Sequence, residues 1–255
     1  MTNERIRRIA YGQSAIDCNC EPGDFLRDEP VFTISRPHPR ARKYLPLPMG
    51  CDLVSYGRNV VAQTSPECAG AVREYLSRVD TAHCMETPGI HLLDTLLAPY
   101  GLKTCFQAEY FLPDVDLLEE LPCEFELRIL TQEDFRELYL PQWSNALCKD
   151  RRHLDVLGVG AYDGQTLVGL AGCSADCDDM WQIGVDVLPE YRRRGIAAAV
   201  TSRLAIEILK RGKVPFYCAA WCNLTSARNA IRCGFRPAWV SLSAAAPEIL
   251  EKMNG

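Results

Sequence analysis

The sequence lacks the features that mark a membrane, secreted or nucleic-acid-binding protein. No apolar run in its 255 residues approaches the roughly 18 residues that a membrane-spanning helix requires. Residues 1–20, MTNERIRRIAYGQSAIDCNC, carry charges but no apolar core of the kind that a signal peptide needs. The formal net charge of −5 argues against a general binder of nucleic acids or membrane surfaces. We therefore expect a cytoplasmic protein with no nucleic-acid or membrane partner.

Regular metal-binding spacings are also missing, although cysteine is abundant. The 13 cysteines include no C-x-x-C pair, and the four histidines lie elsewhere in the chain. In the pairs Cys173/Cys177 and Cys218/Cys222 three residues separate the cysteines, so a zinc site built from them is conceivable but is not the favoured interpretation. An odd count without a secretion signal favours reduced thiols over a disulfide framework. We expect no bound metal, and we expect most cysteines to act as small core side chains.

The clearest pattern present is a strand, a short turn and a helix. Apolar residues alternate with polar or small ones in WQIGVDVL (181–188), which predicts a strand that Pro189 ends. Three arginines, residues 192–194, then precede Gly195. The helix predicted from Gly195 onward has an apolar face with four-residue spacing, formed by Ile196, Val200, Leu204 and Ile208.

This turn has the composition of a pyrophosphate-binding site. A helix N-terminus exposes unpaired N–H groups, glycine allows a phosphate to approach closely, and arginine adds charge-assisted donors. The alternative is an ordinary connection with a solvated basic turn. Residues 186–213 contain seven basic and three acidic side chains in an acidic protein, which favours the anion site. No Gly-Lys-Ser/Thr follows the turn, which disfavours a nucleotide hydrolase.

The first half of the chain predicts a small α+β unit. Residues 1–50 have little pattern and include a proline-rich, basic stretch that we expect to be extended. Residues 51–64 predict two short strands joined by a turn. Helices are expected at 65–79, with Ser65 as the N-cap, and at 87–100, before a strand at 103–112.

An acidic connector at 113–123 then predicts a domain boundary near residue 120. In the second half, Thr131 and Asp134 form a candidate capping pair. The elements expected there are, in order, a strand at 124–130, a helix at 131–138, a hairpin at 155–176, the strand and helix described above, a strand at 214–222 parallel to 181–188, a helix at 223–233 and a strand at 235–243.

Residues 192–197, RRRGIA, match the Arg/Gln-x-x-Gly-x-Gly/Ala signature of the GNAT superfamily of acyl-CoA-dependent N-acyltransferases. The element order from about 124 to 243 also resembles that of a GNAT domain. The resemblance implies an α+β, mixed fold in which a GNAT-like mixed, splayed β-sheet is flanked by helices at 121–255. A smaller α+β domain of unknown role would precede it at 1–120.

The resemblance also implies a set of ligand-binding residues. Backbone N–H groups near Val185 and Val187 would hold the pantetheine of acetyl-CoA and polarise its thioester carbonyl. Asn223 and Ser226 match an Asn-x-x-Ser/Ala motif that contacts coenzyme A. The pyrophosphate would lie on the turn formed by Arg192, Arg193, Arg194, Gly195, Ile196 and Ala197.

One departure affects the catalytic residues. Many GNAT relatives have a tyrosine four residues before the Gly-Phe pair as general acid, and this sequence has Ala230 there. Ser226, one turn earlier, is the candidate replacement, although a serine there also suits a helix start. Asp186 and Glu190 are the candidate general bases, and Asp186 is preferred, although either could instead be a solvated or ion-paired carboxylate. Trp181, Tyr217, Trp221 and Trp239 could line the acceptor pocket or simply pack in the core.

We therefore expect an N-acetyltransferase that moves an acetyl group from acetyl-CoA to a primary amine of a small substrate. Transfer would be direct, within a ternary complex. Two alternatives stay open: a catalytically degenerate acyl-CoA-binding module, which Ala230 suggests, and an N-acyltransferase that uses a longer acyl-CoA. The expected partner is the small amine, and homodimerisation is left open.

Overall fold

The structure is a computed structural model that describes residues 1–254. The chain divides into two compact units, which we describe separately. Unit 1 comprises Met1–Ile9 and Tyr110–Pro237, and unit 2 comprises Ala10–Glu109 and the stretch from Ala238 onward. Among the described residues, no helix is both long and apolar enough to cross a membrane.

The division differs from the boundary expected near residue 120. The chain passes between the units within strand β4 (Lys103–Pro113) and again within strand β10 (Phe235–Ala245). Residues 240–244 of β10 belong to unit 2 because they pair antiparallel with β2 (Cys51–Ser55). The C-terminal residues thus belong to unit 2 through a strand pairing between distant parts of the chain. The amino-acid composition along the chain does not reveal such a pairing.

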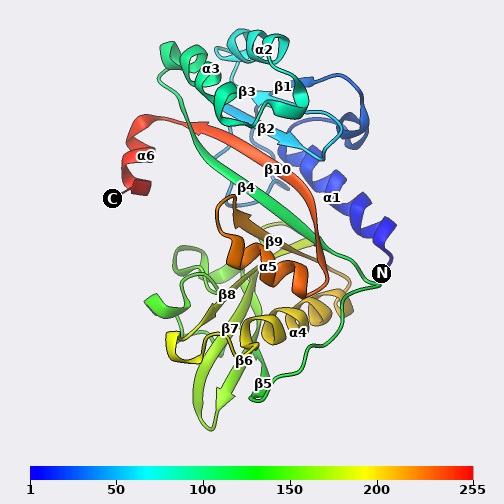
Figure 1. The fold of residues 1–255 in the computed structure, drawn as a ribbon, viewed down its shortest axis with the longest axis vertical. Helices are drawn as coiled ribbons and strands as arrows, with labels where there is room; N and C mark the ends of the chain where they lie inside the picture. The colour runs from blue at the N-terminus through cyan, green and yellow to red at the C-terminus, as the bar shows by residue number, and fades with distance from the viewer. Residues whose placement is uncertain (255) are drawn as a thin grey trace. The chain divides into compact units, whose positions relative to one another are not determined.

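Unit 1 is built on a mixed β-sheet in the order β4-β9-β8-β7-β6-β5 (Figure 1). Strands β5 to β8 pair antiparallel, whereas β8 and β9 pair parallel. Helix α4 (Ile196–Lys210) connects the two parallel strands, and α5 (Leu224–Arg232) follows β9. The strand bounds are β5 Glu126–Thr131, β6 Asp155–Asp163, β7 Thr166–Ser174, β8 Met180–Val187 and β9 Val214–Ala220.

The pairing between β8 and β9 covers only the first part of each strand. The ladder runs from Met180 opposite Val214 to Ile183 opposite Tyr217 and then stops. The remainder of β8 and of β9 is not paired with the other strand. The sheet is therefore splayed at this point, as expected from the sequence.

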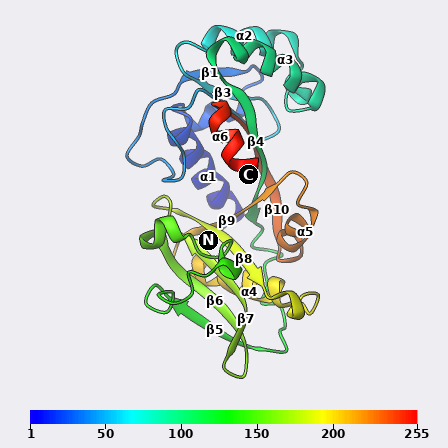
Figure 2. The ribbon, with the colours of Figure 1, turned by 90° about the vertical axis from the view of Figure 1, so that its left-hand side faces the viewer.

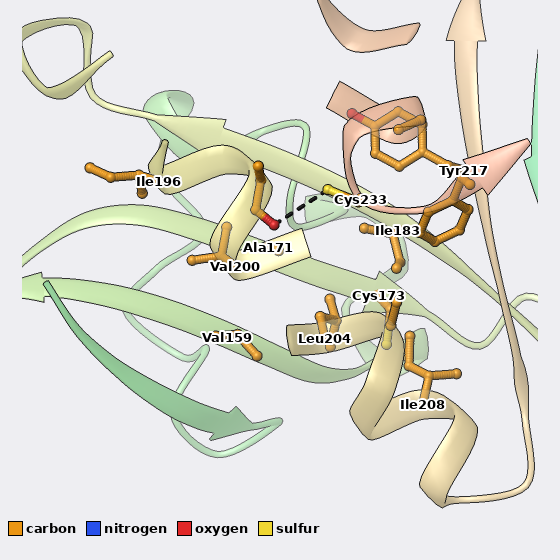
Figure 3. Close-up of a cluster of buried hydrophobic side chains, with 14 of the residues drawn as sticks. Val159, Ala171, Cys173, Ile183, Ile196, Val200, Leu204, Ile208, Tyr217 and Cys233 are labelled. Carbon is orange, nitrogen blue, oxygen red and sulfur yellow. Dashed lines mark hydrogen bonds between the residues drawn. The ribbon is translucent and has the colours of Figure 1, made fainter. Parts of the chain in front are cut away.

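The apolar face of α4 holds unit 1 together. Its four residues with four-residue spacing are at most 1% exposed, as the periodicity predicted. Burial of each such side chain is worth about 1.5–3 kcal/mol. The end of α5 is tied to the first turn of α4 by a hydrogen bond. Cys233 donates it from Sγ to the Ala198 carbonyl oxygen, at 3.3 Å. Figure 3 shows the cluster, which includes Val159, Ala171, Cys173, Ile183, Ile196, Val200, Leu204 and Ile208.

The helix expected at 131–138 is not formed, and turns take its place. Asp134 accepts hydrogen bonds from the backbone N–H and the hydroxyl of Thr131, at 2.7 and 2.9 Å, so the candidate capping pair closes a turn. Phe135 and Trp143 are buried with Leu130 in a separate small cluster. Leu138 and Tyr139 pack against the same cluster, so the turns bring the apolar side chains of this segment together without forming a helix. Two 3-10 helices follow, η4 (Pro141–Trp143) and η5 (Lys149–Leu154).

Unit 2 contains the strand order β1-β3-β2-β10-β4. The hairpin expected at 51–64 is confirmed as β2 and β3, which pair antiparallel, while β1 is parallel to β3. Helices α2 and α3 lie side by side next to β1 and β3 (Figures 1 and 2). The remaining bounds are β1 Val31–Ile34, β3 Val61–Thr64, α2 Ala69–Arg78, α3 Thr87–Leu97, α6 Pro247–Asn254, η1 Pro22–Leu26, η2 Thr81–His83 and η3 Ala98–Tyr100.

Two helix starts in the first half differ from expectation. Helix α1 (Asn3–Asp17) was missed, because several of its buried positions are small or polar, such as Ala10 and Ser14, and give no apolar stripe. Helix α2 begins at Ala69 with Cys68 at its N-cap, rather than at Ser65.

A buried polar cluster lies in unit 2. The Arg42 guanidinium donates to the Asp17 carboxylate at 2.7 Å, and both side chains are 5% exposed. Asp52 is buried near this pair, and burial, followed by the charge of Asp17, raises the pKa of Asp52 to about 7, against the opposing effect of Arg42. One guanidinium therefore serves two buried carboxyl groups, and the fold favours the protonated form of Asp52.

This cluster predicts a pH-dependent stability. The folded-state pKa of Asp52 lies above its unfolded value of 3.8, so its contribution is fully present below about pH 4 and is lost as the pH rises towards 7. We expect Asp52→Asn to flatten the stability of the protein between pH 4 and 7, as measured by urea unfolding across that range. The exposed Asp80→Asn variant should keep the wild-type slope, and an unchanged slope in Asp52→Asn would contradict the assignment.

Candidate functional site

Unit 1 has a cavity of about 930 Å³ at the place where β8 and β9 separate. Its walls come from β8, the turn before α4, the first turn of α4, β9 and α5. The predicted site residues that line it are Val185, Asp186, Val187, Arg192, Arg193, Gly195, Ile196, Ala197, Asn223 and Ser226. The structure thus brings all but one of these predicted residues, Arg194, to one cavity.

The open edge of β8 presents backbone groups to the cavity. The Leu188 N–H donates to the Val168 carbonyl of β7 at 3.0 Å. Successive strand residues direct their backbone groups to alternate sides, so those of Val187 and Val185 point away from β7, to the side that β9 has left. In agreement, the Val187 carbonyl accepts a hydrogen bond from Arg192 Nε at 3.2 Å. The N–H groups of Val185 and Val187 therefore have no strand partner on that side.

The turn before α4 is shaped for an anion. Arg193 and Gly195 have left-handed backbone conformations, with φ of +64° and +82°. For Arg193 this conformation costs on the order of 1–3 kcal/mol, which is typical of a functional turn. Gly195 is the N-cap of α4 and has no side chain that could accept a hydrogen bond. The first N–H groups of the helix therefore receive no partner from the capping residue. A Cβ on Gly195 would meet no atom within 4 Å, and this open space over unpaired donors fits a pyrophosphate.

The three consecutive arginines have different roles. Arg192 and Arg193 line the cavity. Arg194, predicted with them, does not line it, because its guanidinium donates to Glu124 at 2.7 Å. The same guanidinium lies 4.5 Å from the ring centroid of Phe125 and 5.4 Å from that of Tyr191. Arg194 therefore ties the turn to residues 124–125. A run of three identical arginines gives no sign that one of them has this separate role.

A chain of hydroxyl groups lies between β9 and α5. The Asn223 side chain accepts from the Ser226 N–H at 3.1 Å and caps α5. Ser226 Oγ lies 2.9 Å from the hydroxyl of Tyr217, which is 3% exposed and lines the cavity. Burial raises the pKa of Tyr217, although its hydrogen bonds to Ser226 and Asn229 act in the opposite direction. The phenol therefore stays protonated near neutral pH.

The position of the missing tyrosine faces the core. Ala230 is fully buried and packs in the same cluster as Phe235 and Tyr217. The hydroxyl group in this part of the cavity comes instead from β9. From the sequence, Tyr217 was only one of four aromatic residues assigned to the acceptor pocket or the core. Its place opposite Ile183, at the last β8–β9 pair, follows only from the register.

The other three aromatic residues do not line the cavity. Trp181 is partly buried against the core of unit 1, and Trp221 is 59% exposed. Trp239 lies in unit 2, where it stacks on Tyr56 with 5.4 Å between ring centroids. Of the two roles left open, Trp181 and Trp239 therefore take core packing, and Trp221 takes neither in this cavity.

Asp186 has a structural task that the sequence did not indicate. Its carboxylate accepts from the backbone N–H groups of Asn145 and Ala146, both at 2.9 Å, and from Asn145 Nδ2 at 2.6 Å. Both carboxylate oxygens of Asp186 are thus occupied by donors from this segment. Asp186 therefore anchors the wall of the cavity at residues 145–146.

Two glycines make this wall possible. Gly172 of β7 and Gly184 of β8 lie opposite each other in the ladder. A Cβ on Gly184 would collide with the Asn145 carbonyl oxygen, and one on Gly172 with that of Ala146. Since only glycine permits this close approach, the segment at 145–146 rests directly on the two strands.

A splayed sheet with unpaired N–H groups, next to a helix N-terminus and arginines, has the shape and charge to accept an elongated phosphate-bearing ligand. The family model for GNAT acetyltransferase matches residues 103–238, more than half of the sequence. The chain belongs to the GNAT acetyltransferase family, whose members are acyl-CoA-dependent acyltransferases. No curated protein matches the sequence.

Solved structures of similar fold include three bacterial proteins of this family. A GNAT-family protein from Novosphingobium aromaticivorans has 20% identity and a TM-score of 0.41, with 56% of this chain and 66% of that chain covered. A GCN5-related N-acetyltransferase-like protein from Streptococcus suis has 22% identity, a TM-score of 0.45 and coverages of 60% and 67%. A GCN5-related N-acetyltransferase from Kribbella flavida has 17% identity, a TM-score of 0.48 and coverages of 60% and 63%.

The glycine contact predicts a specific sensitivity. Gly184→Ala should lower the free energy of unfolding by about 1–3 kcal/mol, because a methyl group would force Asn145 away from the strand. Gly70→Ala, in helix α2, places its Cβ in open space and should be neutral or stabilising by up to about 1 kcal/mol. Urea unfolding of both variants checks this, and a Gly184→Ala protein as stable as the wild type would exclude the close approach.

Proposed function

We propose that this protein is an N-acetyltransferase that moves an acetyl group from acetyl-CoA to a primary amine of a small substrate, by direct transfer in a ternary complex. The observation that carries the proposal is the single cavity that joins the open edge of β8 to the anion-binding turn of α4. Acetyl-CoA supplies the activated thioester. Family membership supports the class of reaction, and the cavity supports the residues named below.

The chain's own groups account for the binding of coenzyme A. The N–H groups at the start of α4, with Arg192 and Arg193, bind the pyrophosphate. The N–H groups of Val185 and Val187 bind the pantetheine and polarise the thioester carbonyl. Asn223 keeps α5 in place beside the cavity through its cap. Arg194 acts indirectly, because its ion pair with Glu124 holds the turn.

Tyr217 is the best candidate for the acid that protonates the departing thiolate. Tyr217 lines the cavity and carries its proton near neutral pH. Burial raises its pKa and so makes it a weaker acid, which means that its position, rather than its acidity, supports the assignment. Ser226, 2.9 Å away, orients this hydroxyl or relays the proton. Asp186 keeps a positioning role through Asn145 and Ala146, and we assign no side chain as the base.

The alternative of a degenerate acyl-CoA-binding module is favoured only by Ala230. Ala230 is buried in the core, whereas Tyr217 lines the cavity and can take the acid role. An alanine at position 230 therefore does not by itself argue against catalysis. Turnover separates the two functions: a binding module would bind acetyl-CoA without releasing thiol in the presence of any amine. The length of the acyl group is decided by comparing acetyl-, propionyl- and butyryl-CoA in the same assay.

Binding of coenzyme A tests the proposal directly. We expect millimolar CoA to raise the melting temperature of the wild type, because a ligand of the folded state stabilises it. Gly195→Val should abolish CoA binding in isothermal titration, because its side chain occupies the open space over the helix N-terminus. A screen of small primary amines with acetyl-CoA, read out as free thiol, then tests transfer.

Gly212→Val is the matched control for this variant. Gly212 follows the other end of α4, has φ of +75°, and also has open space at its Cβ. The backbone strain of the two variants is therefore similar, but only Gly195 lines the cavity. Equal CoA affinity in both variants would place the pyrophosphate elsewhere.

The acid role of Tyr217 predicts a particular pattern of kinetics. Tyr217→Phe should lower kcat about 10²–10⁴-fold with little change in CoA affinity. If Ser226 acts through Tyr217, Ser226→Ala should lower kcat less, and the double variant should be no slower than Tyr217→Phe alone. Steady-state kinetics with the best amine of the screen measures this, and wild-type kcat in Tyr217→Phe would rule the residue out as the acid.

A further inference from the structure

The cavity has a second cluster of arginines that the anion-binding turn does not explain. Arg228 and Arg232 of α5 both line it. They are four residues apart on one helix, so their side chains emerge on the same face. Both are exposed, and neither forms a hydrogen bond or ion pair with another described residue.

The charge of the cavity wall exceeds what one pyrophosphate requires. Four arginines line the cavity, two on the turn before α4 and two on α5, and Asp186 is its one acidic residue among those described. The Asp186 carboxylate is already bound to Asn145 and Ala146. The excess of positive charge therefore lies at two separate places, in a protein whose formal net charge is −5.

This arrangement fits a ligand with two separate anionic groups. Coenzyme A has a pyrophosphate and, on its ribose, a 3′-phosphate monoester. A phosphate monoester offers several acceptor oxygens to a pair of guanidinium groups, which bind it through charge-assisted hydrogen bonds. We propose that Arg228 and Arg232 bind the 3′-phosphate of coenzyme A and so determine the preference for CoA over 3′-dephospho-CoA. This inference rests on the proposed function.

A structural role accounts for only part of the pair. Arg232 lies in the last turn of α5, where a cation also stabilises the helix dipole. Arg228 lies in the middle of the helix, where that effect is absent. The stability of each variant is therefore measured separately from its ligand binding. Comparing two ligands that differ by one phosphate, CoA and 3′-dephospho-CoA, isolates the binding of the 3′-phosphate.

The experiment is isothermal titration of CoA and of 3′-dephospho-CoA at one fixed ionic strength. We expect the wild type to prefer CoA, and Arg228→Gln and Arg232→Gln each to weaken CoA binding about three- to tenfold. The double variant should weaken CoA binding about tenfold to a hundredfold while leaving 3′-dephospho-CoA nearly unchanged. Its affinities for the two ligands should then converge.

Two further variants complete the test. Arg236→Gln removes an exposed arginine of unit 1 that does not line the cavity, and it should change neither affinity. Arg192→Gln should weaken both ligands by the same factor, since both carry the pyrophosphate. Thermal unfolding of each variant identifies any loss that comes from misfolding.

The outcomes separate this inference from the function on which it rests. A wild type that binds both ligands equally would overturn the inference without the need for any variant, and would leave the proposed function intact. An equal loss of both ligands in the double variant would also overturn it, because the arginines would then contact another part of the molecule. A wild type that binds neither ligand would overturn the proposed function itself.

Discussion

The site depends on one constraint, the early end of the pairing between β8 and β9. Beyond Ile183 and Tyr217 the two strands no longer share hydrogen bonds, so backbone groups of β8 lack a strand partner. Unpaired backbone groups in a folded protein need partners, and the gap leaves those of β8 available to a ligand or to solvent. Helix α4 holds both strands through its buried face, so the gap is a stable feature of the fold rather than a frayed sheet edge.

The second wall of the cavity is built from a different kind of contact. Residues 145–146 have no regular secondary structure, yet three hydrogen bonds to Asp186 and the glycine pair Gly172 and Gly184 hold them against the sheet. The acidic residue on the strand therefore shapes the site through the hydrogen bonds that it accepts. The sequence did not indicate this role, because the donors lie some forty residues away along the chain.

The local elements were predictable because their causes lie within a few residues. Four-residue spacing of apolar side chains predicted α4, alternation predicted β8, and the glycine after three arginines predicted the turn. The helix expected at 131–138 was wrong, since the Thr131–Asp134 pair closes a turn that does not continue into a helix. Helix α1 was missed for another reason, because tertiary contacts bury small and polar side chains that carry no period.

The sequence by itself determined the family, through it the splayed sheet, and the position of the arginine–glycine turn, since a motif of adjacent residues and the periodicity around it suffice for these. Only the tertiary structure decided which side chains face the cavity. It directed Arg194 to Glu124, buried Ala230, placed Tyr217 beside Ser226 and brought Arg228 to the cavity. The physical reason is that these outcomes depend on strand register and on the face that each helix turns to its neighbours. Both are set by packing between segments far apart in the chain, and no short stretch of sequence encodes them.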